Sequence, residues 1–159
     1  MPSITQKAGH ERVLFMVGVR TPKEIIAWAD RTICEEERPD ELLIDLSTTS
    51  PDRFDDLLAS LTRLAAGCDF WRSARSALGE VHDYLVAHPE EAERIAQALE
   101  SSISGNLRRI PDDCNWFAGV EDAFVCAKLG IYGDLESARD DFIRKLGRFK
   151  KEPGSIHVA

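Results

Sequence analysis

Five of the seven prolines in this chain lie in segments that are typical of helix starts. Proline fits the first position of a helix, because the backbone N–H that it lacks would have no partner there. Acidic residues in the first turn are favoured by the positive end of the helix dipole. Each of these prolines has an acidic residue within two positions after it, in the segments Thr21-Pro22-Lys23-Glu24, Arg38-Pro39-Asp40-Glu41, Ser50-Pro51-Asp52-Arg53, His88-Pro89-Glu90-Glu91 and Ile110-Pro111-Asp112-Asp113.

Apolar residues at helical spacing follow these starts, and no alternating strand pattern is present, so the sequence predicts an all-α fold. Residues 8–17 fit a buried strand as well as a helix, and we prefer a helix because no partner strand is evident. We expect one single-domain bundle of about seven or eight helices over residues 1–152 and a loose tail over 153–159. The expected helices cover about residues 8–17, 22–36, 40–46, 50–66, 69–87, 90–104, 112–129 and 134–149.

The composition is typical of a soluble globular protein. Of the 159 residues, 43% are hydrophobic and 30% are charged, which excludes a disordered chain. No apolar run approaches the roughly 20 residues that span a bilayer, and the polar N-terminus lacks the pattern of an export signal. The four cysteines are scattered without a C-x-x-C pair, as in proteins that keep their thiols reduced. These features predict a cytoplasmic protein that does not associate with membranes.

The net charge of −8 is concentrated in one segment. Between residues 35 and 56, nine acidic residues stand against two arginines, so this segment alone holds seven net negative charges. A field of this sign repels nucleic acid and attracts basic proteins. The sequence therefore predicts a basic protein partner and no binding of nucleic acid.

Sequence signatures of catalysis are absent. The chain contains no phosphate-binding G-x-x-x-x-G-K-[ST] loop, no dinucleotide-binding G-x-G-x-x-G and no G-x-S-x-G nucleophile motif. His82 and His88 are six positions apart and point to different sides of a helix, and His88 fits better as a residue that bonds the carbonyls of a helix end. We therefore expect no cofactor, no metal and no catalytic residue.

The acidic residues that do not open a helix are candidates for partner binding. Seven acids of the chain already fit first helical turns. Local structure does not explain Glu35, Glu36, Glu37, Asp30, Asp45, Asp55 and Asp56. A solvated helix face is the simplest explanation of these seven, and a protein-binding face is the functional one. Trp28 and Trp71 lie at the edges of apolar stripes, where a tryptophan either seals the core or contributes to an interface. The predicted partner-binding residues are Trp28, Asp30, Glu35, Glu36, Glu37, Asp45, Asp55 and Asp56.

The segment from about residue 18 to residue 47 resembles a pattern found in small helical bacterial proteins. Its residues are Thr21-Pro22-Lys23-Glu24-Ile25-Ile26-Ala27-Trp28-Ala29-Asp30, then Ile33, an acidic spacer, Pro39 and Glu41-Leu42-Leu43-Ile44-Asp45-Leu46-Ser47. The pattern is roughly P-x-E-[IV]-[IV]-x-W-A-D … I … P-x-E-[LI]-[LI]-[DE]-L-S, in uncharacterised proteins of the polymorphic-toxin immunity type. The resemblance implies an inhibitor of a cognate bacterial toxin, and it implies no catalytic residues.

Three functional hypotheses follow. The first is a non-enzymatic acidic immunity protein that binds a basic toxin domain, such as a nuclease, through residues around Glu35 to Asp56. The second is a helical enzyme with a carboxylate and histidine site built from Glu80, His82, Asp30 and Asp45. The third is a self-associating scaffold subunit that uses Trp28 and Trp71.

Overall fold

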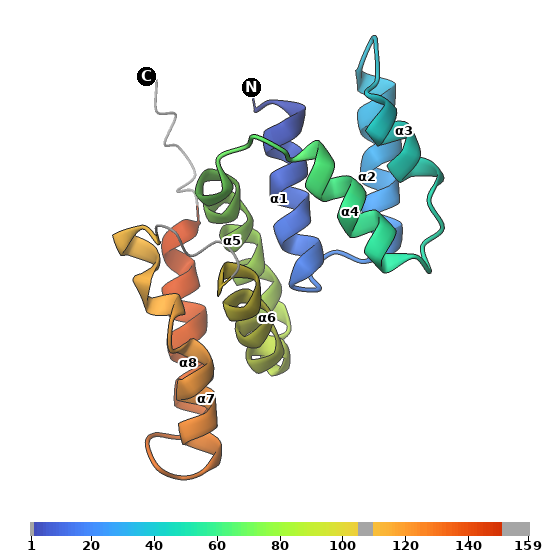
Figure 1. Ribbon diagram of the computed structural model, residues 1–159. Coiled ribbons are helices and arrows are strands. Elements are labelled where there is room, and N and C mark those ends of the chain that lie inside the picture. The colour runs from blue at the N-terminus through green and yellow to red at the C-terminus, as the bar shows by residue number, and fades with distance from the viewer. Residues whose placement is uncertain (1, 105–109, 151–159) are drawn as a thin grey trace. The chain divides into compact units, whose positions relative to one another are not determined.

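The computed structural model describes residues 2–104 and 110–150 (Figure 1). These residues form eight α-helices and three short 3₁₀ helices, without a strand among them, so the all-α prediction is confirmed. The first element is a helix and not a strand. The α-helices are α1 (Ile4–Met16), α2 (Pro22–Glu35), α3 (Glu41–Thr48), α4 (Phe54–Leu64), α5 (Phe70–Ala87), α6 (Ala92–Ser104), α7 (Val120–Lys128) and α8 (Leu135–Leu146), and the 3₁₀ helices are η1 (Pro89–Glu91), η2 (Asp112–Phe117) and η3 (Gly147–Phe149).

The chain divides into two compact units, Met1–Ala77 and Leu78–Ala159, and α5 passes from the first into the second. The single domain over residues 1–152 stays a prediction, because compactness does not say whether the two units unfold separately. The expected cap at Gly105-Asn106 and the expected loose tail over 153–159 lie outside the described residues.

In the first unit, α1 packs against α4, α2 against α3, and α3 against α4. The chain reverses between α2 and α3, so these two helices form an antiparallel hairpin (Figure 1). The core is mostly aliphatic, because each helix turns one stripe of apolar side chains inward. Its buried members are Ala8, Phe15, Ile25, Ala29, Leu43, Leu46, Leu57, Leu61, Leu64 and Ala65.

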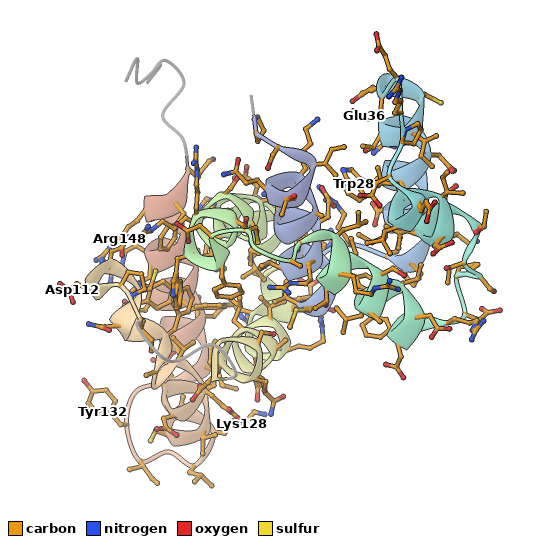
Figure 2. All side chains as sticks on the ribbon, turned by 45° about the horizontal axis from the view of Figure 1, so that its top comes forward. Trp28, Glu36, Asp112, Lys128, Tyr132 and Arg148 are labelled. Atoms are coloured by element: carbon orange, nitrogen blue, oxygen red, sulfur yellow. The ribbon has the colours of Figure 1, made fainter. Side chains whose placement is uncertain are left out.

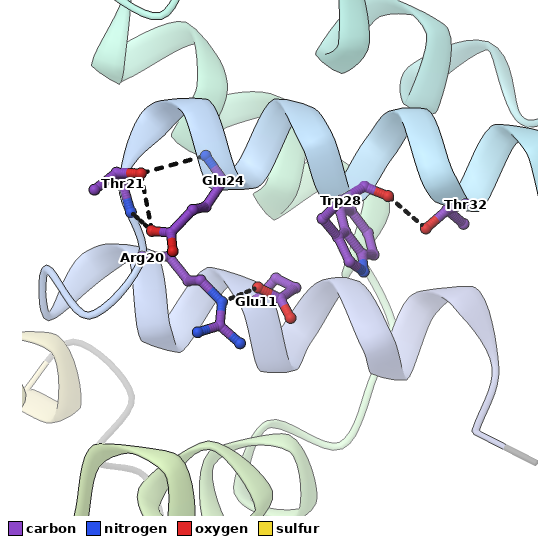
Figure 3. Close-up of polar contacts among 6 residues, drawn as sticks. All are labelled: Glu11, Arg20, Thr21, Glu24, Trp28 and Thr32. Carbon is purple, nitrogen blue, oxygen red and sulfur yellow. Dashed lines mark hydrogen bonds and ion pairs between the residues drawn. The ribbon is translucent and has the colours of Figure 1, made fainter. Parts of the chain in front are cut away.

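The start of α2 is the local structure that the sequence predicted best. The Thr21 hydroxyl accepts a hydrogen bond from the Glu24 amide at 3.3 Å, and the Glu24 carboxylate accepts one from the Thr21 amide at 2.8 Å (Figure 3). This confirms the capping box and the proline at the first helical position. Just before it, Arg20 Nε donates to Glu11 Oε2 at 3.0 Å, and this ion pair joins the α1–α2 connection to the nearly buried Glu11 on α1.

The predicted start of α4 at Ser50 is wrong. Residues 51 and 52 form a turn, and α4 begins at Phe54, with Arg53 as an N-cap that makes no side-chain capping bond. The Ser50 hydroxyl instead accepts a hydrogen bond from the Asp52 amide at 3.5 Å, which is a local turn contact. The Pro51 signal therefore marks this turn and not the first residue of a helix.

The predicted seventh helix, residues 112–129, is two elements. Residues 112–117 form the 3₁₀ helix η2, and α7 begins only at Val120. Between them, Gly119 has φ of +109°, a backbone conformation that favours glycine and cannot occur inside an α-helix. The apolar periodicity runs through both elements, so it did not reveal the break.

In the second unit, α6, α7 and α8 pack against one another. Its core is rich in aromatic side chains: the Phe142 ring lies 6.2 Å from the rings of both Trp116 and Phe124 in edge-to-face geometry, and the Trp116 ring stacks on Phe117 at 4.0 Å. Polar contacts also join these helices. Gln97 Nε2 donates to Glu121 Oε1 at 3.1 Å, and the Lys128 ammonium pairs with the Glu93 carboxylate.

Candidate functional site

The predicted partner-binding residues all lie in the first unit, on α2, on α4, on α3 and in the α2–α3 connection. α2 and α3 are antiparallel neighbours, and α4 packs on α3. The Asp30 carboxylate accepts a hydrogen bond from the Ser47 hydroxyl, which places Asp30 beside the C-terminal end of α3. Glu35 to Glu37 lie near the other end of α3, whose eight residues are about 12 Å long. The acids therefore follow the α2–α3 hairpin and do not converge on a pocket.

Trp28 combines a structural role with partial exposure. Its side chain is partly buried and packs against the core of the first unit. Its backbone carbonyl accepts a hydrogen bond from the buried Thr32 hydroxyl at 2.8 Å (Figure 3). Asp30, two positions further along α2, points to another side of the helix. A partner that contacts Asp30 therefore does not reach the Trp28 ring from the same direction.

The end of α2 carries the densest negative charge. Glu35 is its last residue, and Glu37 follows in the connection to α3. Glu36 is the C-cap with extended backbone, at the end of α2 in Figure 2. Glu35 and Glu37 are exposed and Glu36 is half-buried. Acids at the C-terminal end of a helix face the negative end of its dipole, so this arrangement costs stability locally. Local helix stability therefore does not explain these three acids.

Asp45 is exposed in the middle of α3. Its backbone carbonyl accepts hydrogen bonds from the hydroxyls of Thr48 at 3.2 Å and Thr49 at 2.7 Å, and these bonds help to end the helix. The Asp45 carboxylate is not used in these contacts and faces solvent.

The position of Asp55 and Asp56 in α4 explains why these residues are acidic, and the sequence did not predict this position. Because α4 begins at Phe54, both acids lie in its first turn, where the helix dipole favours them. Asp56 also pairs with Arg53, with 2.5 Å between Arg53 Nε and Asp56 Oδ2. Of the seven predicted acids, these two are therefore the ones that lie at a favourable helix end.

Six of the seven predicted acids make no ion pair within the described residues: Asp30, Glu35, Glu36, Glu37, Asp45 and Asp55. Two exposed apolar side chains lie among them. Ile44 is 45% exposed next to Asp45, and Phe54 is 44% exposed next to Asp55, with its ring stacked on Phe15 at 4.4 Å. An exposed apolar residue at this place could be predicted from the sequence, because the consecutive residues Leu42, Leu43 and Ile44 cannot all face inward on one helix.

The residues of the alternative enzyme site fall in different units, Asp30 and Asp45 in the first and Glu80 and His82 in the second. Within the second unit, His82 Nδ1 lies 3.0 Å from Asp83 Oδ1, and Lys150 Nζ lies 2.9 Å from the same oxygen. Hydrogen bonds from His82 and Lys150 hold the pKa of Asp83 below its ordinary value. This cluster ties α5 to the segment after η3. His88, whose expected role was at a helix end, has an exposed imidazole with Nδ1 3.6 Å from Glu90 Oε1.

A cavity of about 300 Å³ lies in the second unit between α8 and the η2–α7 segment. Trp116, Phe124 and Phe142 contribute aromatic walls, and Asp141 and Lys145 form an ion pair at 2.8 Å on its lining. None of the predicted partner-binding residues lines it. Across the described ranges, no three His, Cys, Asp or Glu side chains are arranged to hold a metal ion.

No family model, curated protein or solved structure matches this chain. Among the described residues, no helix combines the length and the apolarity that crossing a bilayer requires.

Proposed function

We propose that this chain is a non-enzymatic acidic binding protein, an immunity protein that inhibits a cognate bacterial toxin in the cytoplasm by direct contact. The partner is a basic protein domain and not a nucleic acid. It contacts Glu35, Glu36, Glu37 and Asp45 first, with Asp30, Asp55 and Asp56 at the margins. It reaches the exposed edge of Trp28 from another side of α2 than Asp30. No cofactor takes part.

The observation that carries this proposal is the run of acids without ion pairs along the α2–α3 hairpin. Glu35 to Glu37 stand at the unfavourable end of α2 and make no ion pair within the described residues. An arrangement that costs stability needs another reason, and attraction of a basic partner is one. Concentrated charge of one sign accelerates association with a partner of opposite sign and selects against acidic competitors.

Ile44 and Phe54 add the apolar component that a tight complex needs. Charged residues at a protein interface mainly set the rate and the specificity, whereas buried apolar anchors supply most of the affinity. Both residues lie within the acidic segment, and each is a little under half exposed. In this proposal, Ile44 and Phe54 become buried when the basic domain binds.

The experiment is affinity capture of the purified chain from a lysate of its own organism, with washes at low and then high salt and identification by mass spectrometry. We expect a single basic protein to be retained at low salt and released at high salt, because screening weakens contacts between exposed charges. The captured protein is then assayed for toxicity with and without the chain. Failure to retain a basic protein, or retention of one whose activity the chain does not change, would contradict the proposal.

A further inference from the structure

The cavity of the second unit contains none of the predicted partner-binding residues, and it has the features of a small-molecule site. Its volume of about 300 Å³ is at the lower end of the range for cavities that hold small ligands. Three of its lining residues, Ala118, Gly119 and Ala123, are themselves exposed, so the cavity reaches the protein surface. A small molecule can therefore enter it while the unit stays folded.

The sequence forms this cavity by placing small residues opposite large ones. Gly119, with φ of +109°, separates η2 from α7, so the two elements are not one continuous helix. On the other side of the cavity, α8 presents Ala138, Asp141, Phe142 and Lys145, whose spacing of three and four positions puts them on one helix face. The small side chain of Ala138 leaves space that a larger one would fill.

Trp116 gives the cavity a flat aromatic wall. Its ring stacks on Phe117 at 4.0 Å, and the Phe142 ring meets it edge-on at 6.2 Å. The indole N–H already donates to the Asp113 carbonyl at 2.9 Å, so the ring needs no further polar partner, and it is partly exposed on the lining. An aromatic ligand matches this wall, because offset and edge-to-face contacts between rings are favourable.

Lys145 supplies the charge that selects the ligand. Its ammonium lies 5.8 Å from the centre of the Trp116 ring, and Nζ lies 2.8 Å from Asp141 Oδ2. The other Asp141 oxygen pairs with Arg144, so two cations share one carboxylate and one positive charge is in excess. An ammonium has three N–H donors, and within the described residues Lys145 uses one of them, on Asp141. Lys145 can therefore donate to an anionic ligand and keep its ion pair.

The same cluster disfavours a cationic ligand. Hydrogen bonds from Lys145 and Arg144 hold the pKa of Asp141 below its ordinary value, so this carboxyl group is ionised at neutral pH. Lys145 already occupies the position beside both Asp141 and Trp116 where an alkylammonium ligand would bind. A cation would have to displace Lys145, whereas an anion uses the donors that remain.

We propose that this cavity binds a small aromatic carboxylate, with its ring against Trp116 and its carboxylate accepting hydrogen bonds from Lys145 Nζ. Benzoate is the simplest compound of this class. This ligand site goes beyond the partner binding proposed above and does not depend on it, because it uses no residue of the acidic surface.

The first test is titration of the full chain with three compounds, followed by amide NMR. Benzamide keeps the ring of benzoate without its charge, and acetate keeps the charge without the ring. We expect benzoate to produce saturable shifts centred on Gly119, Ala123 and Ala138, with a dissociation constant on the order of 1 mM. Benzamide should bind about tenfold more weakly, because a charge-assisted hydrogen bond is replaced by a neutral one. Acetate should give no saturable shifts at these positions.

Two variants test the ring and charge contributions separately. Lys145→Met removes the ammonium and leaves Asp141 paired with Arg144, so benzoate should bind only as tightly as benzamide, and benzamide binding should be unchanged. Ala138→Leu fills part of the cavity, so it should abolish the binding of both compounds.

Each variant has a matched control in the same unit. Lys128→Met removes an ammonium that pairs with Glu93 away from the lining, and Ala98→Leu enlarges a half-buried alanine of α6 that does not line the cavity. Both controls should bind benzoate as the wild type does, and circular dichroism checks the fold of all four variants. Absence of saturable benzoate shifts, benzamide binding as tight as benzoate binding in the wild type, or shifts centred elsewhere would overturn the proposal. An unchanged benzoate affinity in folded Lys145→Met would overturn it as well.

Discussion

The helices α2–α4 and the helices α6–α8 use their charged side chains in different ways. In α6–α8, some acidic residues join one helix to another, as in the Lys128–Glu93 pair, or pair within α8, as Asp141 does with Lys145. Along the α2–α3 hairpin, the acids of Glu35 to Glu37 and Asp45 face solvent and make no ion pair in the described part of the chain. The first arrangement supports the fold, and the second leaves charge available to a partner.

The two regions also differ in their cores. The core around α2–α4 is built mainly from leucine, isoleucine and alanine, whereas Trp116, Phe117, Phe124 and Phe142 pack ring against ring around α7 and α8. The cavity beside Trp116 and Phe142 lies in the aromatic region.

The largest expected effect comes from truncating a core residue in either region. We expect Phe142→Ala to cost about 3–5 kcal/mol of unfolding free energy and Leu57→Ala about 2–5 kcal/mol, because both side chains are buried and leave a cavity. Urea unfolding followed by circular dichroism measures both.

Residue-resolved hydrogen exchange on the same variants tests the single-domain prediction. Because α5 is continuous across the boundary between the two units, we expect each substitution to accelerate the slowest exchange in both. Acceleration confined to residues 78–150 in Phe142→Ala would mean that the second unit opens separately and would contradict a single cooperative domain.

Substitution of two glycines, one in each compact unit, is expected to have the next largest effect on the unfolding free energy. A Cβ at Gly79 would lie 2.9 Å from the Phe149 backbone carbonyl oxygen, and a Cβ at Gly9 would lie 2.8 Å from the Ser73 hydroxyl oxygen. A backbone carbonyl cannot rotate away as a side chain can. Both substitutions gain helix propensity. We therefore expect Gly79→Ala to cost about 1–3 kcal/mol and Gly9→Ala less, because the atom nearest to its new Cβ belongs to a side chain. Equal urea midpoints for the two variants would contradict this ranking.

Removal of a helix cap is expected to lower the unfolding free energy by a smaller amount. Thr21 caps α2 and Asp134 caps α8, where its carboxylate accepts a hydrogen bond from the Ser137 amide at 2.8 Å. We expect Thr21→Ala and Asp134→Ala each to lower the unfolding free energy by about 1 kcal/mol. Thr62→Ala is the matched control, because its hydroxyl bonds the Leu58 carbonyl inside α4 and caps nothing. A loss in the control as large as in the cap variants would contradict the capping role.

The pH dependence is the smallest expected effect. Hydrogen bonds from the backbone and hydroxyl of Thr21 hold the pKa of Glu24 below its ordinary value of 4.5. Since this pKa is lowered on folding, the stabilisation is present above pH 4.5 and is lost as the pH falls through the folded-state pKa. Glu24→Gln keeps the capping box but does not titrate. In urea unfolding between about pH 3 and pH 7, the free energy of unfolding should therefore fall less steeply with decreasing pH in this variant than in the wild type. An unchanged slope would contradict a contribution of Glu24 to the acid sensitivity.

How well the sequence predicted each element depended on how local its signals were. The Thr21 to Glu24 start needs only four residues, and the prediction is confirmed. The predictions around Pro51 and Gly119 are wrong: α4 begins after the predicted residue, and the predicted seventh helix is interrupted. The apolar periodicity continues through a proline turn and through a glycine break, so it did not reveal either. Because α4 was predicted to begin too early, Asp55 and Asp56 were not predicted to lie in its first turn.

The candidate surface was predictable in its charge but not in its arrangement. The excess of acids between residues 35 and 56 is visible in the sequence, but the contact of Asp30 with Ser47 depends on how α2 packs on α3. The exposure of Tyr132 was equally hidden, since an aromatic residue in a short connection is as compatible with burial as with exposure.

The measurement that tests the central claim most directly is the salt dependence of binding to the captured partner by charge-reversed variants. The test variant is Glu36→Lys/Glu37→Lys/Asp45→Lys, and the matched control, with the same change in net charge on exposed acids of the second unit, is Asp122→Lys/Glu136→Lys/Asp140→Lys. We predict that the test variant weakens binding at least a hundredfold and flattens its salt dependence, while the control stays within a few-fold of wild type. Unchanged affinity in the test variant, or equal losses in both, would contradict the claim that the α2–α3 acids form the partner-binding surface.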